Sequence, residues 1–174
     1  AISPGCGVST SRPCHPRDDL ALVLDAAMLG EAGKRDGAVR GWQGRLVLTP
    51  HPGEMAVLMD CDEEDASAAL AEAAARRFDA VVVLKTPETW IATPGAETLH
   101  YPGGGPGLAT GGSGDVLAGI IAGLLARGAA PRVAAGWGVW LHGEAGKRLA
   151  QRIGPLGFLG RELPGEVPGL MASV

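Results

Sequence analysis

The sequence has few cysteines and no patch of basic residues. Cys6, Cys14 and Cys61 are its three cysteines, an odd number without Cys-x-x-Cys spacing. This argues against a disulfide framework and against a structural zinc site, and it favours a reducing compartment. The 15 lysines and arginines are outnumbered by 19 acidic residues, which gives a formal net charge of −4. No Lys/Arg cluster is interleaved with aromatic residues, so we do not expect a nucleic acid partner.

Long hydrophobic runs are also lacking. The longest, residues 116–126, is about half of the roughly 20 residues that a membrane-spanning helix needs. No basic segment followed by an apolar one opens the sequence, as it would in a secretory signal. We therefore expect a soluble, cytoplasmic protein without a membrane partner. The length of 174 residues suits one domain with a hydrophobic core and is too short for two of ordinary size.

Glycine, in contrast, is abundant. The 28 glycines are roughly twice the usual share of about 7%. Many of them stand in residues 103–115, directly before the apolar run that predicts a helix. Because glycine has no Cβ, several backbone N–H groups can turn toward one point, and the helix N-terminus adds unpaired donors and a positive dipole end. This segment therefore predicts an anion site, formed by Gly111, Gly112, Ser113 and Gly114.

Asp115 lies at the mouth of this predicted site. A carboxylate is unfavourable there if the loop only holds phosphate, but it suits a general base that accepts a proton from a hydroxyl attacking phosphate. The simpler alternative is a flexible loop whose aspartate caps a helix. The segment contains no Gly-Lys-Ser/Thr, which excludes a P-loop, and the glycine pattern alone is too weak to indicate a Rossmann fold. We favour phosphoryl transfer.

Three short apolar runs predict buried parallel strands at residues 20–24, 45–49 and 80–84. Polar residues follow each run, at the sheet edge where ligands of parallel α/β proteins usually bind. Asp25 follows the first run and could orient magnesium or polar substrate groups, or could cap the next helix. Lys85 follows the third and can reach nucleotide phosphates as a mobile point charge.

The second run is followed by Pro50-His51-Pro52-Gly53-Glu54. Two prolines fix the backbone around His51, and Glu54 suits the positive N-terminal end of the following helix. His51 is therefore a candidate ligand-binding residue, the alternative being a solvated histidine in a turn. His142, in a predicted helix over residues 133–151, is interpreted as a packing residue and is left out of the chemistry.

Other segments complete the expected α/β architecture. Residues 89–92 and 97–101 predict a hairpin or two edge strands, and residues 63–78 and 116–127 predict helices. The tail from residue 154 predicts a loop, a short helix and a frayed end. Alternating strands and helices imply a three-layer domain with a mostly parallel sheet.

Four segments resemble the ADP/ATP-dependent NAD(P)H-hydrate dehydratases, which belong to the ribokinase-like superfamily. They are Ala-Thr-Gly-Gly-Ser-Gly-Asp-Val-Leu-Ala-Gly at 109–119, Thr-Pro-His-Pro-Gly-Glu at 49–54, Val-Val-Leu-Lys at 82–85 and Ala-Ile-Ser-Pro-Gly-Cys-Gly at 1–7. They occur in the family's order. The resemblance implies a single three-layer ribokinase-like α/β domain over residues 1–174, with helices flanking a mostly parallel sheet whose N-terminal strands are missing.

The resemblance also implies a reaction. ADP or ATP, with Mg²⁺, would phosphorylate the hydroxyl on the hydrated nicotinamide ring of NAD(P)H, and elimination of phosphate would restore the double bond. Asp115 would be the catalytic base and contact the hydrate, beside the anion site defined above. The nucleotide would also contact Lys85, Thr86, Pro87, Glu88 and Thr89, and the hydrate would contact Gly5, Gly7 and His51. No residue is assigned as a metal ligand, and a homo-oligomer is expected.

Two other functions remain open. A small-alcohol kinase of the same superfamily, acting on hydroxyethylthiazole or a sugar, would share the loop and Asp115 but would not need the motif around His51. A non-catalytic nucleotide-binding module or fragment is the other, since the N-terminal strands are expected to be missing and Ala27 and Gly105 stand where the family has an acid and an asparagine. Thr86 replaces a glycine of the family. The sequence does not distinguish ADP from ATP.

Overall fold

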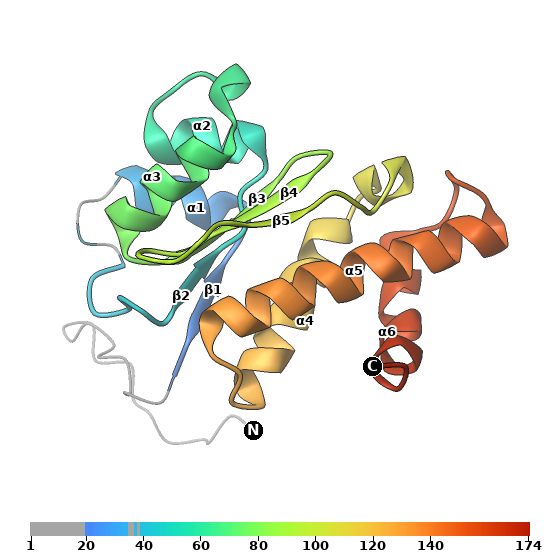
Figure 1. The fold of residues 1–174 in the computed structure, drawn as a ribbon. Coiled ribbons are helices and arrows are strands. Elements are labelled where there is room, and N and C mark those ends of the chain that lie inside the picture. Colours follow the sequence, from blue (N-terminus) through green and yellow to red (C-terminus); the bar gives the residue numbers. More distant parts are fainter. Residues whose placement is uncertain (1–19, 35–36, 38) are drawn as a thin grey trace, which may run out of the picture.

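The computed structural model describes residues 20–34, 37 and 39–174. Within them a five-stranded sheet has the order β1-β2-β3-β4-β5 (Figure 1). The strands are β1 (Leu22–Leu24), β2 (Leu46–Leu48), β3 (Val81–Lys85), β4 (Thr89–Ala92) and β5 (Leu99–Tyr101). The predicted opening turn, with Gly5 and Gly7, lies outside the described residues.

The sheet is mixed. β1, β2 and β3 are parallel neighbours, with Leu22 opposite Leu46 and Val47 opposite Val81, whereas β4 and β5 are antiparallel to their neighbours. The expected parallel pairing therefore holds for β1, β2 and β3. The change of direction has a local cause, because only residues 86–88 connect β3 to β4. A parallel pair needs a crossover of a dozen or more residues, and a connection of three residues therefore forces a hairpin.

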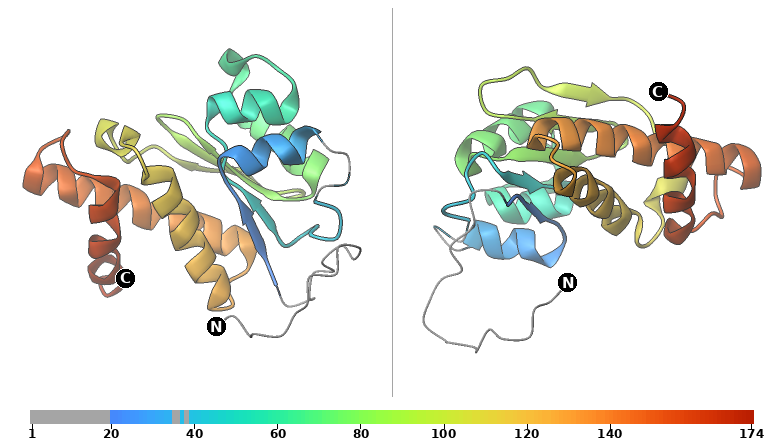
Figure 2. Two further views of the ribbon diagram at one scale, coloured as in Figure 1. Left: turned by 180° about the vertical axis from the view of Figure 1, so that it is seen from behind. Right: turned by 90° about the horizontal axis from the view of Figure 1, so that it is seen from below.

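Helices cover both faces of the sheet and make the predicted three layers (Figures 1 and 2). Leu46 and Leu48 pack toward helices α1, α2 and α3, while Val47 between them packs toward α4 and α5. This alternation follows from the two-residue period of a strand. The helices are α1 (Ala27–Lys34), α2 (Pro52–Met59), α3 (Ala68–Phe78), α4 (Ser113–Ala126), α5 (Pro131–Ile153) and α6 (Leu163–Met171), with short 3-10 turns at Glu63–Asp65, Pro106–Ala109 and Gly160–Glu162.

The predicted helices differ from the observed ones mainly at their ends. The expected helix over 63–78 is divided, because the Ser67 hydroxyl accepts a hydrogen bond from the Leu70 N–H and starts α3 anew. The tail is better packed than expected, since Phe158, Leu163 and Leu170 are buried against Leu141 and Leu149 of α5. Among the described helices, none combines the length and the apolar character needed to cross a membrane.

Candidate active site

A cavity of about 810 Å³ opens where the parallel strands end. Asp25 directly after β1 and residues from β3, β4, β5, α2, the glycine-rich loop, α4 and α5 line it, so segments that are distant in sequence meet there. Nine of the predicted site residues are among those that line it: His51, Lys85, Thr86, Pro87, Thr89, Ser113, Gly114 and Asp115, together with the candidate Asp25. Glu88, Gly111 and Gly112 are not among the lining residues, although they adjoin residues that are.

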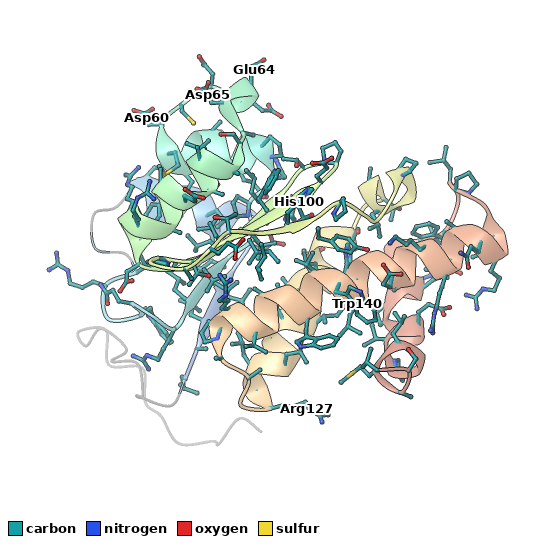
Figure 3. The ribbon with its side chains drawn as sticks, in the orientation of Figure 1. Asp60, Glu64, Asp65, His100, Arg127 and Trp140 are labelled. Atoms are coloured by element: carbon teal, nitrogen blue, oxygen red, sulfur yellow. The ribbon has the colours of Figure 1, made fainter. Side chains whose placement is uncertain are left out.

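Glu88 points to a different partner. Its carboxylate lies 2.9 Å from His100 Nε2, and the His100 ring stacks on Trp90 with ring centroids 4.1 Å apart. Figure 3 shows His100 on the β4–β5 hairpin. His100 is itself partly exposed. The nucleotide-binding role of Glu88 remains a prediction.

The glycine-rich loop leads directly into α4. Gly112 adopts a left-handed conformation with φ of +83° and forms the N-cap, a conformation that favours glycine. The Ser113 N–H donates to the Thr110 carbonyl at 3.2 Å, and the Val116 N–H donates to the Gly112 carbonyl at 3.1 Å. Within the described part of the chain, the N–H groups of Gly114 and Asp115 have no backbone acceptor. These first-turn donors are available to an anion.

Asp115 stands in the first turn of α4, where its side chain is exposed and lines the cavity. Within the part of the chain that the structure describes, it forms no hydrogen bond or ion pair with another side chain. A carboxylate in this place can accept a proton from a hydroxyl group that approaches an anion held at the loop. The geometry suits the predicted general base.

His142 holds the start of α4 from behind. Its Nε2 lies 3.0 Å from the Ser113 carbonyl oxygen and 2.9 Å from the Ser113 hydroxyl oxygen, and both residues are buried. Burial lowers the pKa of His142 from 6.5 to about 4, against a smaller upward effect of the hydrogen bond to Ser113. The imidazole is therefore neutral at physiological pH, and Nε2–H donates to the carbonyl. Sequence reasoning correctly placed it as a packing residue but did not find that it supports the anion loop.

This burial makes stability depend on pH. Because the folded-state pKa lies below the unfolded one, the unfolded chain takes up the proton first, and stability is lost as the pH falls from 6.5 toward 4. At about 1.4 kcal/mol for each pH unit, we expect the wild type to lose about 3 kcal/mol from this group. His142→Gln, which can donate to Ser113 but does not titrate, should lack this loss. Urea unfolding of both proteins at pH 7.5 and pH 4.5 measures the difference, and equal losses would contradict the interpretation.

Lys85 is held by two carboxylates rather than being mobile. Its Nζ lies 2.8 Å from Asp25 Oδ1 and 3.7 Å from Glu54 Oε2, and Asp25 Oδ1 also accepts a hydrogen bond from the Thr49 hydroxyl at 2.8 Å. Burial by itself would raise the pKa of Asp25, but the Lys85 ammonium and the Thr49 hydroxyl outweigh it and lower that pKa below its ordinary value. Asp25 is thus a charged partner of Lys85.

This ion pair lies against the anion loop. A methyl group placed on Gly114 would be 3.3 Å from Lys85 Nζ and 3.5 Å from Asp25 Oδ2. The structure therefore brings together the end of β1, the end of β3 and the first turn of α4. An anion bound at the Gly114 N–H would also be close to the Lys85 ammonium.

His51 is the N-cap of α2 and takes part in a capping box. Its Nδ1 accepts a hydrogen bond from the Glu54 N–H at 3.3 Å, and Glu54 Oε2 accepts one from the His51 N–H at 2.8 Å. Pro52 occupies the first turn, where its missing N–H costs nothing. Because Nδ1 accepts, the neutral ring carries its proton on Nε2. The side chain is 55% exposed, so this N–H is accessible to a ligand in the cavity.

Comparison with known proteins identifies the family of this chain. A family model described as NAD(P)H-hydrate dehydratase matches residues 14–168. The chain is 47% identical to the ADP-dependent (S)-NAD(P)H-hydrate dehydratase of Xanthomonas campestris pv. campestris over 86% of this chain and 51% of that protein. It is 39% identical to the bifunctional NAD(P)H-hydrate repair enzyme Nnr of Moorella thermoacetica over 100% of this chain and 34% of that protein. The chain thus spans about half, or less, of the length of these relatives.

Solved structures of similar proteins share the fold of this chain. The ADP/ATP-dependent NAD(P)H-hydrate dehydratase of Bacillus subtilis, co-crystallised with ATP/Mg²⁺, superposes with a TM-score of 0.77 at 30% identity, over 89% of this chain and 55% of that one. Hydroxyethylthiazole kinase of Pyrococcus horikoshii superposes with a TM-score of 0.63 at 22% identity, over 82% of this chain and 57% of that one, and shares the fold. The sheet, the anion loop and the matched residues together show that this ribokinase-like chain belongs to the NAD(P)H-hydrate dehydratase family.

Proposed function

We propose that the protein repairs hydrated NADH or NADPH, using ADP or ATP to drive the loss of water from the nicotinamide ring. The observation that carries this proposal is the placement of the Asp115 carboxylate beside the Gly114 and Asp115 N–H groups, which have no backbone acceptor among the described residues, in the same cavity as His51 and Lys85. A base, an anion site and a cation that line one cavity suit phosphoryl transfer to a hydroxyl group.

The proposed reaction has two steps. The ring hydroxyl oxygen attacks the terminal phosphorus of the nucleotide, Asp115 accepts the hydroxyl proton, and the bond from phosphorus to its bridging oxygen breaks. The phosphate ester then loses phosphate by cleavage of the carbon–oxygen bond, and loss of a ring proton restores the double bond. The Gly114 and Asp115 N–H groups and Gly111, Gly112 and Ser113 of the loop stabilise charge on the transferred group. Lys85 to Thr89 hold the nucleotide, and His51, with Gly5 and Gly7, holds the hydrate.

Magnesium fits this site as a companion of the nucleotide. The described residues contain no group of three or more histidine, cysteine, aspartate or glutamate side chains that could hold a metal ion. Mg²⁺ needs no such group when phosphates supply most of its ligands and the protein supplies one or two carboxylates. Asp25, the residue that the sequence suggested for magnesium, would be such a carboxylate: it lines the cavity, and its Oδ2 lies toward Gly114 while its Oδ1 faces Lys85, which leaves Asp115 as the base. Bound there, the ion would neutralise phosphate charge.

Two relatives named ADP-dependent support ADP as the co-substrate. The motif around His51 favours the hydrate over a small alcohol as the second substrate. The odd number of cysteines supports a reducing compartment such as the cytoplasm. Val133 and Trp137, both exposed and one turn apart on α5, support the further proposal that the protein forms a homo-oligomer.

Hydrated NADH tests the proposal directly. The purified protein is mixed with the hydrate, Mg²⁺ and either ADP or ATP, and the absorbance of reduced nicotinamide is followed. We expect a rise in absorbance that requires a nucleotide. If nucleotide is instead consumed with hydroxyethylthiazole or a sugar and not with the hydrate, the protein is a kinase. Binding of ADP or ATP in a thermal-shift titration without turnover of either substrate would indicate a non-catalytic module.

A further inference from the structure

Glu54 lies between the two side chains that are proposed to hold the two substrates. Its Oε1 is 3.5 Å from His51 Nε2, and its Oε2 is 3.7 Å from Lys85 Nζ. The Glu54 side chain is only 18% exposed and lines the cavity. One carboxylate thus contacts both the proposed hydrate-binding histidine and the proposed nucleotide-binding lysine.

The Glu54 carboxylate has little freedom to move. Oε2 accepts the His51 backbone N–H at 2.8 Å, so rotation of the side chain would break the capping box of α2. Lys85 is fixed from the other side, since its Nζ donates to Asp25 at 2.8 Å and its backbone N–H donates to the Pro50 carbonyl at 2.8 Å. The end of β3 and the start of α2 are therefore joined by backbone and side-chain contacts together.

We propose that Glu54 is a positioning residue that fixes His51 relative to Lys85, and through them the hydrate hydroxyl relative to the terminal phosphoryl group. This inference rests on the proposed function. Attack on phosphorus requires the reacting atoms to approach to about 3–3.5 Å, and a misplacement of about 1 Å can reduce the rate about 100-fold. A residue that sets the separation of the two binding groups therefore acts mainly on the rate of the chemical step.

The charges of Asp25, Glu54 and Lys85 predict how nucleotide affinity should change in a Glu54 variant. Asp25 and Glu54 are two carboxylates around the single ammonium of Lys85, and Glu54 competes with a nucleotide phosphate for that ammonium. Removal of the Glu54 charge should leave nucleotide affinity unchanged or increase it. A lower rate together with undiminished nucleotide affinity is the pattern expected of a positioning role, and loss of a helix cap alone would not produce it.

The test uses Glu54→Gln. Glutamine at this position keeps the capping box, because its oxygen can accept the His51 N–H, but it has no charge. We expect kcat for dehydration of hydrated NADH to fall by roughly 10- to 50-fold. This is less than the roughly 100-fold loss for a displacement of about 1 Å between the reacting atoms, because the capping box is retained. The dissociation constant for ADP should not increase, and the unfolding temperature should stay within about 2 °C of wild type, because the cap is retained.

Glu166→Gln is the matched control. Glu166 also lies in the first turn of a helix, pairs with Arg152 at 2.9 Å and has a side chain that is 16% exposed, but it does not line the cavity. The Glu166→Gln variant should therefore have the kcat of the wild type. Active wild type with a Glu54→Gln variant whose kcat is within twofold of wild type would overturn this inference alone. Wild type that neither binds ADP or ATP nor restores NADH would overturn the proposed function, and the inference with it.

Discussion

Replacement of Asp115 by asparagine should lower kcat for dehydration of hydrated NADH by about 100- to 10,000-fold, the usual contribution of a general base. The side chain keeps its size, and the two first-turn N–H groups stay in place, because neither depends on the carboxylate. Affinity for ADP should be equal or higher, since a negative charge next to the phosphates is removed. Steady-state kinetics and calorimetric titration with ADP measure the two effects separately.

Asp65→Asn is the control for this prediction. Asp65 is an exposed acid in the Glu63–Asp65 turn, which Figure 3 shows beyond α2 at a distance from the glycine-rich loop, and it does not line the cavity. Its replacement should change neither parameter. If Asp115→Asn retains more than a tenth of the wild-type kcat while the control is active, Asp115 is not the base.

Lys85→Ala should weaken both the fold and nucleotide binding. The Lys85 and Asp25 side chains are 19% and 15% exposed, so removal of the ammonium leaves a largely buried carboxylate with hydrogen bonds from the Thr49 hydroxyl and the Ala26 backbone but no cation. Breaking such a pair costs about 3 kcal/mol, and the pKa of Asp25 should rise. We also expect the dissociation constant for ADP to increase about 10- to 100-fold, because a charged hydrogen bond to phosphate is worth roughly 1.5–3 kcal/mol. Urea unfolding and ADP titration measure these changes.

Lys34→Ala provides the comparison. Lys34 is exposed in the last turn of α1 and does not line the cavity, so its loss should cost less than about 1 kcal/mol and leave ADP affinity unchanged. Unaltered ADP affinity in Lys85→Ala would show that Lys85 serves the fold and not the nucleotide.

The sequence was sufficient to predict the elements whose patterns are local. The apolar runs before Asp25 and Lys85 are strands, and the glycine-rich loop does open a helix, because short buried strands and helix starts depend on neighbouring residues. Their polar ends meet at one cavity, as the parallel arrangement predicts.

Side-chain contacts between segments that are distant in sequence could not be predicted from local sequence patterns. Asp25 and Lys85 are 60 residues apart, and their pairing depends on the register of β1, β2 and β3. Glu54 was interpreted only as a charge that suits a helix start, a role that it also has. Its contact with Lys85 follows from tertiary packing. The same holds for His142, since a histidine within a helix gives no sign of which loop it supports.

The three-residue turn between β3 and β4 restricts how this family member can vary. Lys85 pairs with Thr89 across the turn, and the Thr86 hydroxyl closes it by donating to the Glu88 carbonyl. One inserted residue would shift the register of β4, so that Ile91 and Trp90 would exchange the faces on which they pack. Evolution can therefore change the identity of the residues proposed to hold the nucleotide, as threonine at 86 illustrates, far more readily than their number.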